Sequence, residues 1–191
     1  MNFSLNLKTQ PALEPVTLAE IKAHSVVDFV DDDALLDIYA RTARERVEKD
    51  TGICLIDQVW LQGLECFEDE IKLLKTPNAT VVSIKYLDAD GAEQTLATED
   101  YAVGERFGVT RICPAYGKSW PAIRAGLNAI TIEFTAGFGE DGNAVPALLK
   151  QAIMVMAEHL YENRGVVSPV NLAPVPESYA SLIASYEQVG V

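Results

Sequence analysis

The strongest helix signal in the sequence is the stretch Val145–Gly165, which runs VPALLKQAIMVMAEHLYENRG. Pro146 suits the first helical position, because its missing N–H would have no partner there in any case. Apolar residues recur at steps of three and four and form one stripe: Leu149, Ala152, Ile153, Met156 and Leu160, widened by Leu148 and Val155. Gly165, directly after Arg164, marks the end of the helix. So broad a stripe predicts a core helix that other elements cover on more than one side.

The length and composition of the chain are those of a globular protein. Its 191 residues are enough to bury a core without a disulfide or metal, and 49% of them are hydrophobic. The cysteines Cys54, Cys66 and Cys113 are odd in number and contain no C-x-x-C pair, so we expect buried free thiols and no zinc site. No apolar run approaches the ~18 residues of a membrane span, and the N-terminus lacks the features of a signal peptide.

The net charge is strongly negative. The chain carries 28 acidic and 15 basic residues, a balance of −13, which argues against tight binding to a phosphate backbone. Two interpretations stay open. The acidic residues form a solvated surface, or they form a wall that repels DNA and lets it slide past without adhering.

Two helices are expected near the N-terminus. Residues 1–15 are irregular and form either a flexible arm or an edge strand. A capping box of Thr17 and Glu20 begins a short helix. The carboxylates of Asp31–Asp33 then complement the positive end of a longer helix over about 32–50, which Gly52 ends.

The apolar period of the longer helix divides its residues into two faces. Its apolar face holds Leu35, Leu36, Tyr39, Ala43 and Val47, and its polar face holds Arg41, Arg44, Glu45, Glu48 and Lys49. After Gly52 the period changes from that of helices to that of strands. Strands are expected at about 55–67, 71–74, 81–87, 93–96, 101–103, 109–113 and 129–135. Asp88–Gly91 predicts a tight hairpin turn, and a second hairpin is expected across Gly104–Gly108.

The C-terminal tail, residues 166–191, is expected to be flexible and extended around its prolines, apart from one short helix over 177–187. That helix carries Tyr179, Leu182, Ile183 and Tyr186 on one side. A helix this short is marginal in water, so it must dock on its own domain or on a neighbour, and these four residues are the candidate interface. The fold class is thus a single α+β domain. A helical bundle-like part, from helices at about 17–50 and 146–187, is interrupted by a mainly antiparallel β region at about 55–135.

The residues give no support for catalysis, a cofactor or a metal. His24 and His159 lie in expected helices without a nearby partner, and no P-loop or nucleophile motif occurs. Glu133, Glu140 and Asp141 are three carboxylates in a chain rich in acids, and coincidence explains them. A small enzyme on an α+β frame remains the alternative, which a pocket with perturbed acids would favour.

Several short motifs follow one another in a fixed order. They are EPVTLAEIKAH, DDDALL, VEKDTG, YLDADGAEQTL, SWP, EFTAGFG, VPALLKQAI and YENRG, which together span roughly Glu14–Gly165. In this order they resemble the head–tail connector (adaptor) proteins of tailed phages and prophages.

The resemblance implies a structural, non-catalytic protein of the virion neck, made in the host bacterial cytoplasm before assembly. Its implied partners are the portal protein, a downstream tail or stopper protein, and other copies of itself in a twelvefold ring. DNA would pass through that ring without specific binding, and neither a cofactor nor a membrane is involved. Another neck or tail-completion protein, or a monomeric domain without a ring, remains an alternative.

Overall fold

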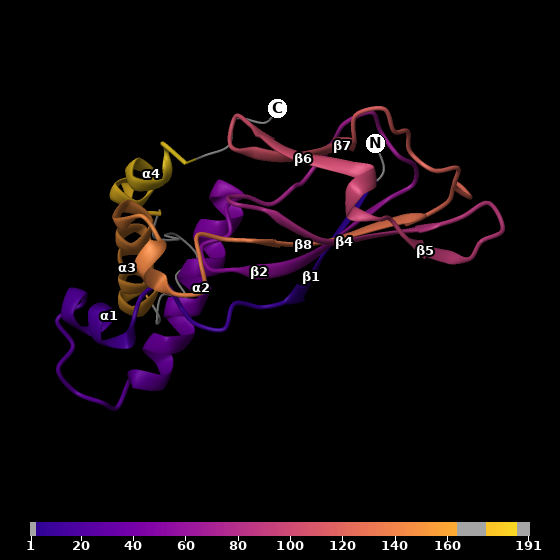
Figure 1. Ribbon diagram of the computed structural model, residues 1–191. Coiled ribbons are helices and arrows are strands. Elements are labelled where there is room, and N and C mark those ends of the chain that lie inside the picture. The colour runs from indigo at the N-terminus through magenta and orange to yellow at the C-terminus, as the bar shows by residue number, and fades with distance from the viewer. Residues whose placement is uncertain (1–2, 164–174, 187–191) are drawn as a thin grey trace. The chain divides into compact units, whose positions relative to one another are not determined.

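The computed structural model describes residues 3–163 and 175–186. It divides the chain into two compact units, one of helices and one of strands (Figure 1). The strand unit consists of Asp57–Phe138 together with the described residues up to Pro11, and the helical unit consists of the other described residues. The α+β class is confirmed, because antiparallel sheets interrupt the helical part of the sequence.

The helical unit is built around α3 (Ala147–Glu162), the helix expected from the broad apolar stripe. Three other helices pack against it: α1 (Leu18–His24), α2 (Asp33–Thr51) and α4 (Glu177–Ile183). Four stripe residues are buried, Leu149, Ala152, Ile153 and Met156, whereas Leu160 is half-buried and Leu148 is exposed. The stripe is therefore narrower than predicted, although several helices do cover α3. The expected end of this helix at Gly165 lies outside the described residues.

The capping box that starts α1 and the glycine that ends α2 are found as predicted. The hydroxyl of Thr17 accepts a hydrogen bond from the N–H of Glu20 at 3.2 Å, and the Glu20 carboxylate accepts one from the N–H of Thr17 at 2.7 Å. Gly52 ends α2 in the left-handed conformation, with φ of 74°. Asp32 occupies the N-cap position of α2 without a capping hydrogen bond, because its carboxylate accepts one from the Tyr161 hydroxyl at 2.7 Å.

Arg44 lies in the interior of the helical unit, so its predicted place on the polar face of α2 is wrong. The side chain is 5% exposed, and its guanidinium donates to Glu14 and to Glu48, both at 2.7 Å. Glu48 also accepts from the N–H of Leu55 at 2.9 Å. Burial by itself would lower the pKa of Arg44, but the carboxylates of Glu48 and Glu14 outweigh burial and raise that pKa. The ion cluster therefore stays charged and joins three segments of the unit.

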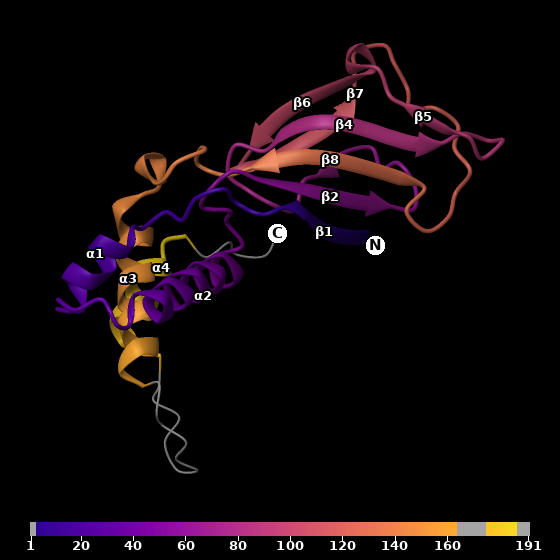
Figure 2. The same cartoon turned by 90° about the horizontal axis from the view of Figure 1, so that it is seen from below.

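The strand unit contains two antiparallel sheets. The five-stranded sheet has the order β1 (Phe3–Thr9), β2 (Gln58–Leu64), β8 (Ile130–Ala136), β4 (Thr80–Leu87) and β5 (Glu93–Thr95). The other sheet has the order β3 (Ile71–Lys72), β7 (Val109–Pro114) and β6 (Tyr101–Arg106), and it lies over one face of the first (Figure 2). Two short 3-10 helices, η1 (Thr98–Asp100) and η2 (Gly142–Ala144), complete the described elements.

The core of the strand unit follows the period of two expected for a sheet with one buried face. Along β8, Ile130, Ile132 and Phe134 are fully buried, whereas the intervening Thr131 and Glu133 are partly exposed. The strand predicted at 129–135 is thus confirmed in both its position and its alternation.

Two expectations for the strand unit need correction. Residues 3–9 are not a flexible arm, because they form β1 and pair with β2 along the sheet edge, which was the other alternative. The second hairpin has no long loop across Gly104–Gly108, because β6 continues to Arg106. Its turn consists of Phe107 and Gly108, with φ of 55° and 73°. A phenylalanine at positive φ is uncommon. Because Phe107 stands where two-residue turns usually have asparagine, the sequence lacks the Asn-Gly signal of such a turn.

Candidate assembly surfaces

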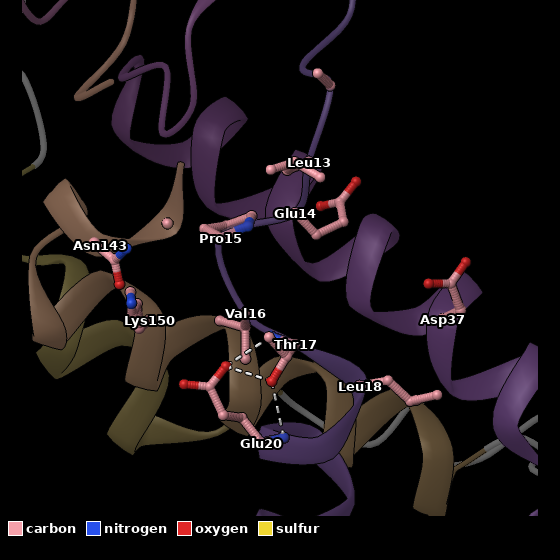
Figure 3. A pocket seen from close by; sticks show the side chains of 12 residues that line it. Leu13, Glu14, Pro15, Val16, Thr17, Leu18, Glu20, Asp37, Asn143 and Lys150 are labelled. Atoms are coloured by element: carbon pink, nitrogen blue, oxygen red, sulfur yellow. Dashed lines mark hydrogen bonds between the residues drawn. The ribbon is translucent and has the colours of Figure 1, made fainter. Parts of the chain in front are cut away.

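A groove of about 680 Å³ lies in the helical unit, beside the chain segment that leads into α1 (Figure 3). It is lined by Ala12–Leu18, Glu20, Asp37, Gly142, Asn143 and Lys150. This volume is within the range of about 300–1,000 Å³ that is usual for binding pockets.

The walls of the groove are held by local hydrogen bonds and by one close backbone contact. Pro15 and Val16 are buried, and Figure 3 shows how the hydrogen bonds between Thr17 and Glu20 hold the turn that follows them. Gly142 approaches the same segment so closely that a Cβ atom there would lie 2.5 Å from the carbonyl oxygen of Pro15. Only glycine fits at this point, and the contact fixes η2 against the segment.

The carboxylates that line the groove are engaged by other groups of the same unit. Glu14 receives the guanidinium of Arg44 at 2.7 Å, and Asp37 receives that of Arg41 at 3.3 Å. Glu20 is held by Thr17, whose backbone N–H and then whose hydroxyl lower the pKa of the Glu20 carboxyl. Glu14 and Asp37 are therefore paired with arginines, whereas Glu20 keeps its negative charge and is held by hydrogen bonds.

Lys150 is the charged group of the groove that lacks a close partner. Within residues 3–163 and 175–186 its ammonium forms no ion pair shorter than 4 Å. Its positive charge does contribute, as a minor cause, to the lowered pKa of Glu20. The groove thus combines apolar side chains such as Leu13, which is 58% exposed, with three carboxylates and one lysine, whose ammonium acts on Glu20.

A second surface is the loop that connects α1 to α2. Five of its six residues from Val26 to Asp31 are exposed: Val26, Asp28, Phe29, Val30 and Asp31. Val26 is 89% exposed and Val30 is 72% exposed, which is unusual for apolar side chains that lie so close together in the sequence. The loop therefore presents an apolar patch with two carboxylates around it.

The conformation of this loop is held by specific contacts. The Lys22 ammonium donates to the carbonyl of Phe29 at 2.6 Å and to the carboxylate of Asp33 at 2.5 Å. The N–H of Val27 donates to the carbonyl of Lys22 at 3.0 Å, and the Val27 side chain is buried. Because both ends are bonded, the exposed residues between them are presented in a defined conformation.

The short C-terminal helix α4 docks on its own unit. Of the two alternatives, docking on its own domain or on a neighbour, the structure shows the first. Tyr179 and Ile183 are 2% and 3% exposed and pack in the helical unit, where α4 contacts α3 and α2. The Tyr179 hydroxyl donates to the Asp50 carboxylate at 2.9 Å. Burial, and next this hydrogen bond, raise the pKa of Tyr179. Leu182 and Tyr186 are half-buried, so of the four candidate interface residues these two keep accessible surface.

The residues weighed for catalysis do not come together. His24 Nε2 lies 3.2 Å from Glu158, and His159 Nδ1 lies 3.2 Å from the Asn163 amide. Glu133 pairs with Lys8 in the strand unit, whereas Asp141 in the helical unit accepts the N–H of Asn143 at the start of η2. Within the described ranges there is no group of three or more His, Cys, Asp or Glu residues that would suit a metal ion.

The cysteines depart in part from expectation. Cys54 is buried, but Cys66 and Cys113 are exposed, so the prediction of buried thiols is wrong for these two. None of the three, all of which are described, takes part in a disulfide. No helix in the described part of the chain has both the length and the apolar character needed to cross a bilayer.

The sequence reasoning missed both the groove and the loop. A groove depends on how distant segments pack, and no sequence pattern signals it. The loop had one available signal, the apolar residues in VVDFVD at 26–31, which follow neither a helical nor a strand period.

No family model matches the sequence, and no curated protein matches it. Solved structures do match along the whole chain. A chain from the neck of the empty gene transfer agent (GTA) particle, determined with sixfold symmetry, is 29% identical with a TM-score of 0.80. That match covers 98% of this chain and 97% of the other. A chain of the native GTA virion is also 29% identical, with a TM-score of 0.81 and coverage of 98% and 96%.

A further match comes from the neck of the native GTA particle with twelvefold symmetry. It is 30% identical, with a TM-score of 0.79, and it covers 98% of this chain and 97% of that one. The likeness therefore includes both units and nearly every residue, and the motif order from Glu14 to Gly165 indicates the same kind of protein. The chain belongs to the head–tail connector (adaptor) family and is a structural component of the neck of a phage-like particle.

Proposed function

We propose that twelve copies of this chain form a ring beneath the portal of a phage-like particle, and that DNA passes through the ring. The single observation that supports this most is the full-length likeness to a neck chain in a particle with twelvefold symmetry. A twelvefold ring is also compatible with the related neck determined with sixfold symmetry, because every twelvefold arrangement contains a sixfold axis.

The proposed partners are the portal on one side of the ring and a tail or stopper protein on the other. Leu182 of α4 and Tyr186 are the proposed contacts with one of these partners, because both side chains remain half-exposed. Tyr186 lies in the turn after α4, since the helix ends at Ile183 and not near residue 187 as predicted. The net charge of −13 supports passage of DNA without adhesion. The role is non-catalytic, in keeping with relatives that are components of a virion neck.

The experiment that tests this function mixes the purified protein with the portal of its own particle and images the mixture by electron microscopy. Native mass spectrometry of the protein alone is the companion measurement. A twelvefold ring stacked on the portal is expected, whether or not the free protein is a monomer. Binding to tail components without binding to the portal would instead indicate a tail-completion protein, and binding to neither would refute the adaptor role.

The contact through α4 has its own test. The combined variant Leu182→Ser and Tyr186→Ser should fold like the wild type, because the buried anchors Tyr179 and Ile183 are untouched, and it should bind portal or tail protein more weakly. Ser181→Ala on the exposed side of α4 is the matched control. Wild-type binding of both partners by the double variant would exclude this contact.

A further inference from the structure

The strand β6 forms a free outer edge of the three-stranded sheet. Its hydrogen-bonded neighbour in that sheet is β7, and within the described residues no backbone hydrogen bond from any other segment reaches it. Five of its six residues, Ala102–Arg106, are exposed. An edge strand leaves a row of backbone N–H and C=O groups unpaired, and a strand of another molecule can pair with them.

The turn of the β6–β7 hairpin determines which backbone groups of β6 face outward. Both residues of the turn Phe107–Gly108 have positive φ, so the flanking Arg106 and Val109 bond each other across a two-residue turn. Hydrogen-bonded and non-hydrogen-bonded pairs alternate along an antiparallel ladder. Glu105 and Val103 therefore belong to non-hydrogen-bonded pairs, and their backbone N–H and C=O groups point away from β7.

The partner of the first residue of β6 agrees with this alternation. Tyr101 lies opposite Pro114, which has no N–H to donate and fits a non-hydrogen-bonded pair. Natural sheets shield edges that must stay unpaired with bulges, prolines or charged residues. Between Tyr101 and Gly104, β6 has a continuous register, no proline and no charge. It also has an apolar side chain there, Val103, which is 48% exposed. This edge is therefore suited to receive another strand.

The strand β1 forms a second long free edge, on the five-stranded sheet. It pairs with β2, and the register is continuous from Phe3 to Leu7. Phe3 is 56% exposed and Leu7 is 41% exposed. Lys8 follows at the register shift, and its ammonium bonds Glu133 at 2.6 Å. The opposite edge of the same sheet, β5, has only three residues, so β1 and β6 are the long edges of the strand unit.

These two edges lie on opposite sides of the strand unit. Figure 2 shows β6 outermost on one side and β1 outermost on the other, with β7, β4, β8 and β2 between them, and Figure 1 agrees. A closed ring requires every subunit to carry two different surfaces that complement each other, since each contact is heterologous. Two strand edges on opposite sides of one unit meet this requirement, because the backbone groups of one edge complement those of the other.

We infer that β6 of each subunit pairs with β1 of the next copy of this chain, so that strand is added to strand across the subunit boundary. This inference rests on the ring assembly proposed above. The exposed apolar side chains of both strands, Val103 on β6 and Phe3 and Leu7 on β1, lie at the interface that this pairing creates.

Glu105→Pro with Glu105→Ala as its matched control tests the use of the β6 edge. Both variants remove the exposed carboxylate, but only proline removes the outward N–H and places a ring at the edge. Because that N–H makes no bond within its own sheet, both variants should keep the wild-type urea midpoint in tryptophan fluorescence. The apparent affinity for ring formation should fall by about tenfold or more for Glu105→Pro and stay unchanged for Glu105→Ala.

A disulfide cross-link identifies β1 as the partner strand, and it does not depend on how proline is tolerated. In a background of Cys66→Ser and Cys113→Ser, Val103→Cys is combined with one cysteine at each position from Ser4 to Leu7 in turn. A disulfide needs Cα atoms within about 7 Å, so at least one pair should give a ladder of covalent oligomers beyond the dimer in assembled rings. Val103→Cys combined with Gln94→Cys on β5 is the matched control and should give no ladder.

The possible outcomes separate this contact from the ring itself. Ring formation is measured by native mass spectrometry and electron microscopy, with the portal present if it is needed as a template. Rings of Glu105→Pro as stable as those of Glu105→Ala, or rings without any cross-link to β1, would overturn this contact but not the ring. Loss of portal or tail binding by Glu105→Pro with intact rings would assign the edge to that partner instead. Absence of wild-type rings even on the portal would overturn the proposed function, and the contact with it.

Discussion

Arg44 holds together three segments of the helical unit, and its replacement by methionine should be the costliest single change on α2. Methionine keeps an unbranched apolar stem and removes the guanidinium that bonds Glu14 and Glu48 at 2.7 Å. The two carboxylates stay behind with side chains that are 23% and 12% exposed, so they lose their counter-charge where water reaches them poorly. Loss of one partner from a buried ion pair costs about 3–5 kcal/mol. Because Glu14 is partly hydrated, we expect Arg44→Met to lower the free energy of unfolding by about 3 kcal/mol.

Arg41→Met is the matched control on the same helix. Its side chain is 55% exposed and pairs with Asp37 at 3.3 Å, an i,i+4 pair on the surface, and with Glu14 at 3.9 Å. Pairs of this kind contribute about 0.3–0.5 kcal/mol, so the control should be close to the wild type. Both arginines contact Glu14, at 3.9 Å from Arg41 and at 2.7 Å from Arg44, so the contrast compares an exposed arginine with a buried one at the same carboxylate.

The assay is urea denaturation at neutral pH followed by far-ultraviolet circular dichroism, which reports on the helices. Trp60 and Trp120 both belong to the strand unit, so their fluorescence follows that unit separately. Adding Glu48→Gln to Arg44→Met should recover part of the loss, because the amide keeps an oxygen acceptor for the Leu55 N–H and carries no charge. If Arg44→Met costs no more than Arg41→Met, the buried cluster does not stabilise the helical unit.

Three further predictions concern stability. Thr17→Ala removes the capping box and should cost about 1 kcal/mol. Because the folded state lowers the pKa of Glu20, this contribution is complete above the ordinary value of 4.5 and is lost as pH falls through the lower folded-state pKa. Wild type and variant should therefore converge in acid, and a constant difference would contradict the capping role. Tyr179→Phe keeps the buried ring and removes the hydrogen bond to Asp50, at a cost of about 1–2 kcal/mol. An unchanged urea midpoint would show that this bond adds nothing. Phe134→Ala in the core of the strand unit should cost about 3–5 kcal/mol, seen as a lower midpoint in tryptophan fluorescence, with a smaller loss counting against its full burial.

Features that depend on neighbours in the sequence could be predicted from the residues alone. The capping box at Thr17, the left-handed end of α2 at Gly52 and the alternation of β8 arise within a few residues of chain, and all three are found. The core helix α3 was predictable for the same reason, because a helical period places its apolar residues on one side whatever packs there. The order of such local motifs also sufficed for the resemblance to adaptor proteins.

Features that depend on distant partners could not be predicted in this way. Periodicity placed Arg44 among exposed residues, because it cannot show that Glu14, thirty positions away, accompanies the guanidinium into the interior. It could not choose between an arm and a strand for residues 3–9, because the choice depends on pairing with β2. The same holds for the groove and for the loop that begins at Val26. Local periodicity states which residues are able to face a core or solvent, whereas the partners they meet are set by contacts between segments far apart in the chain.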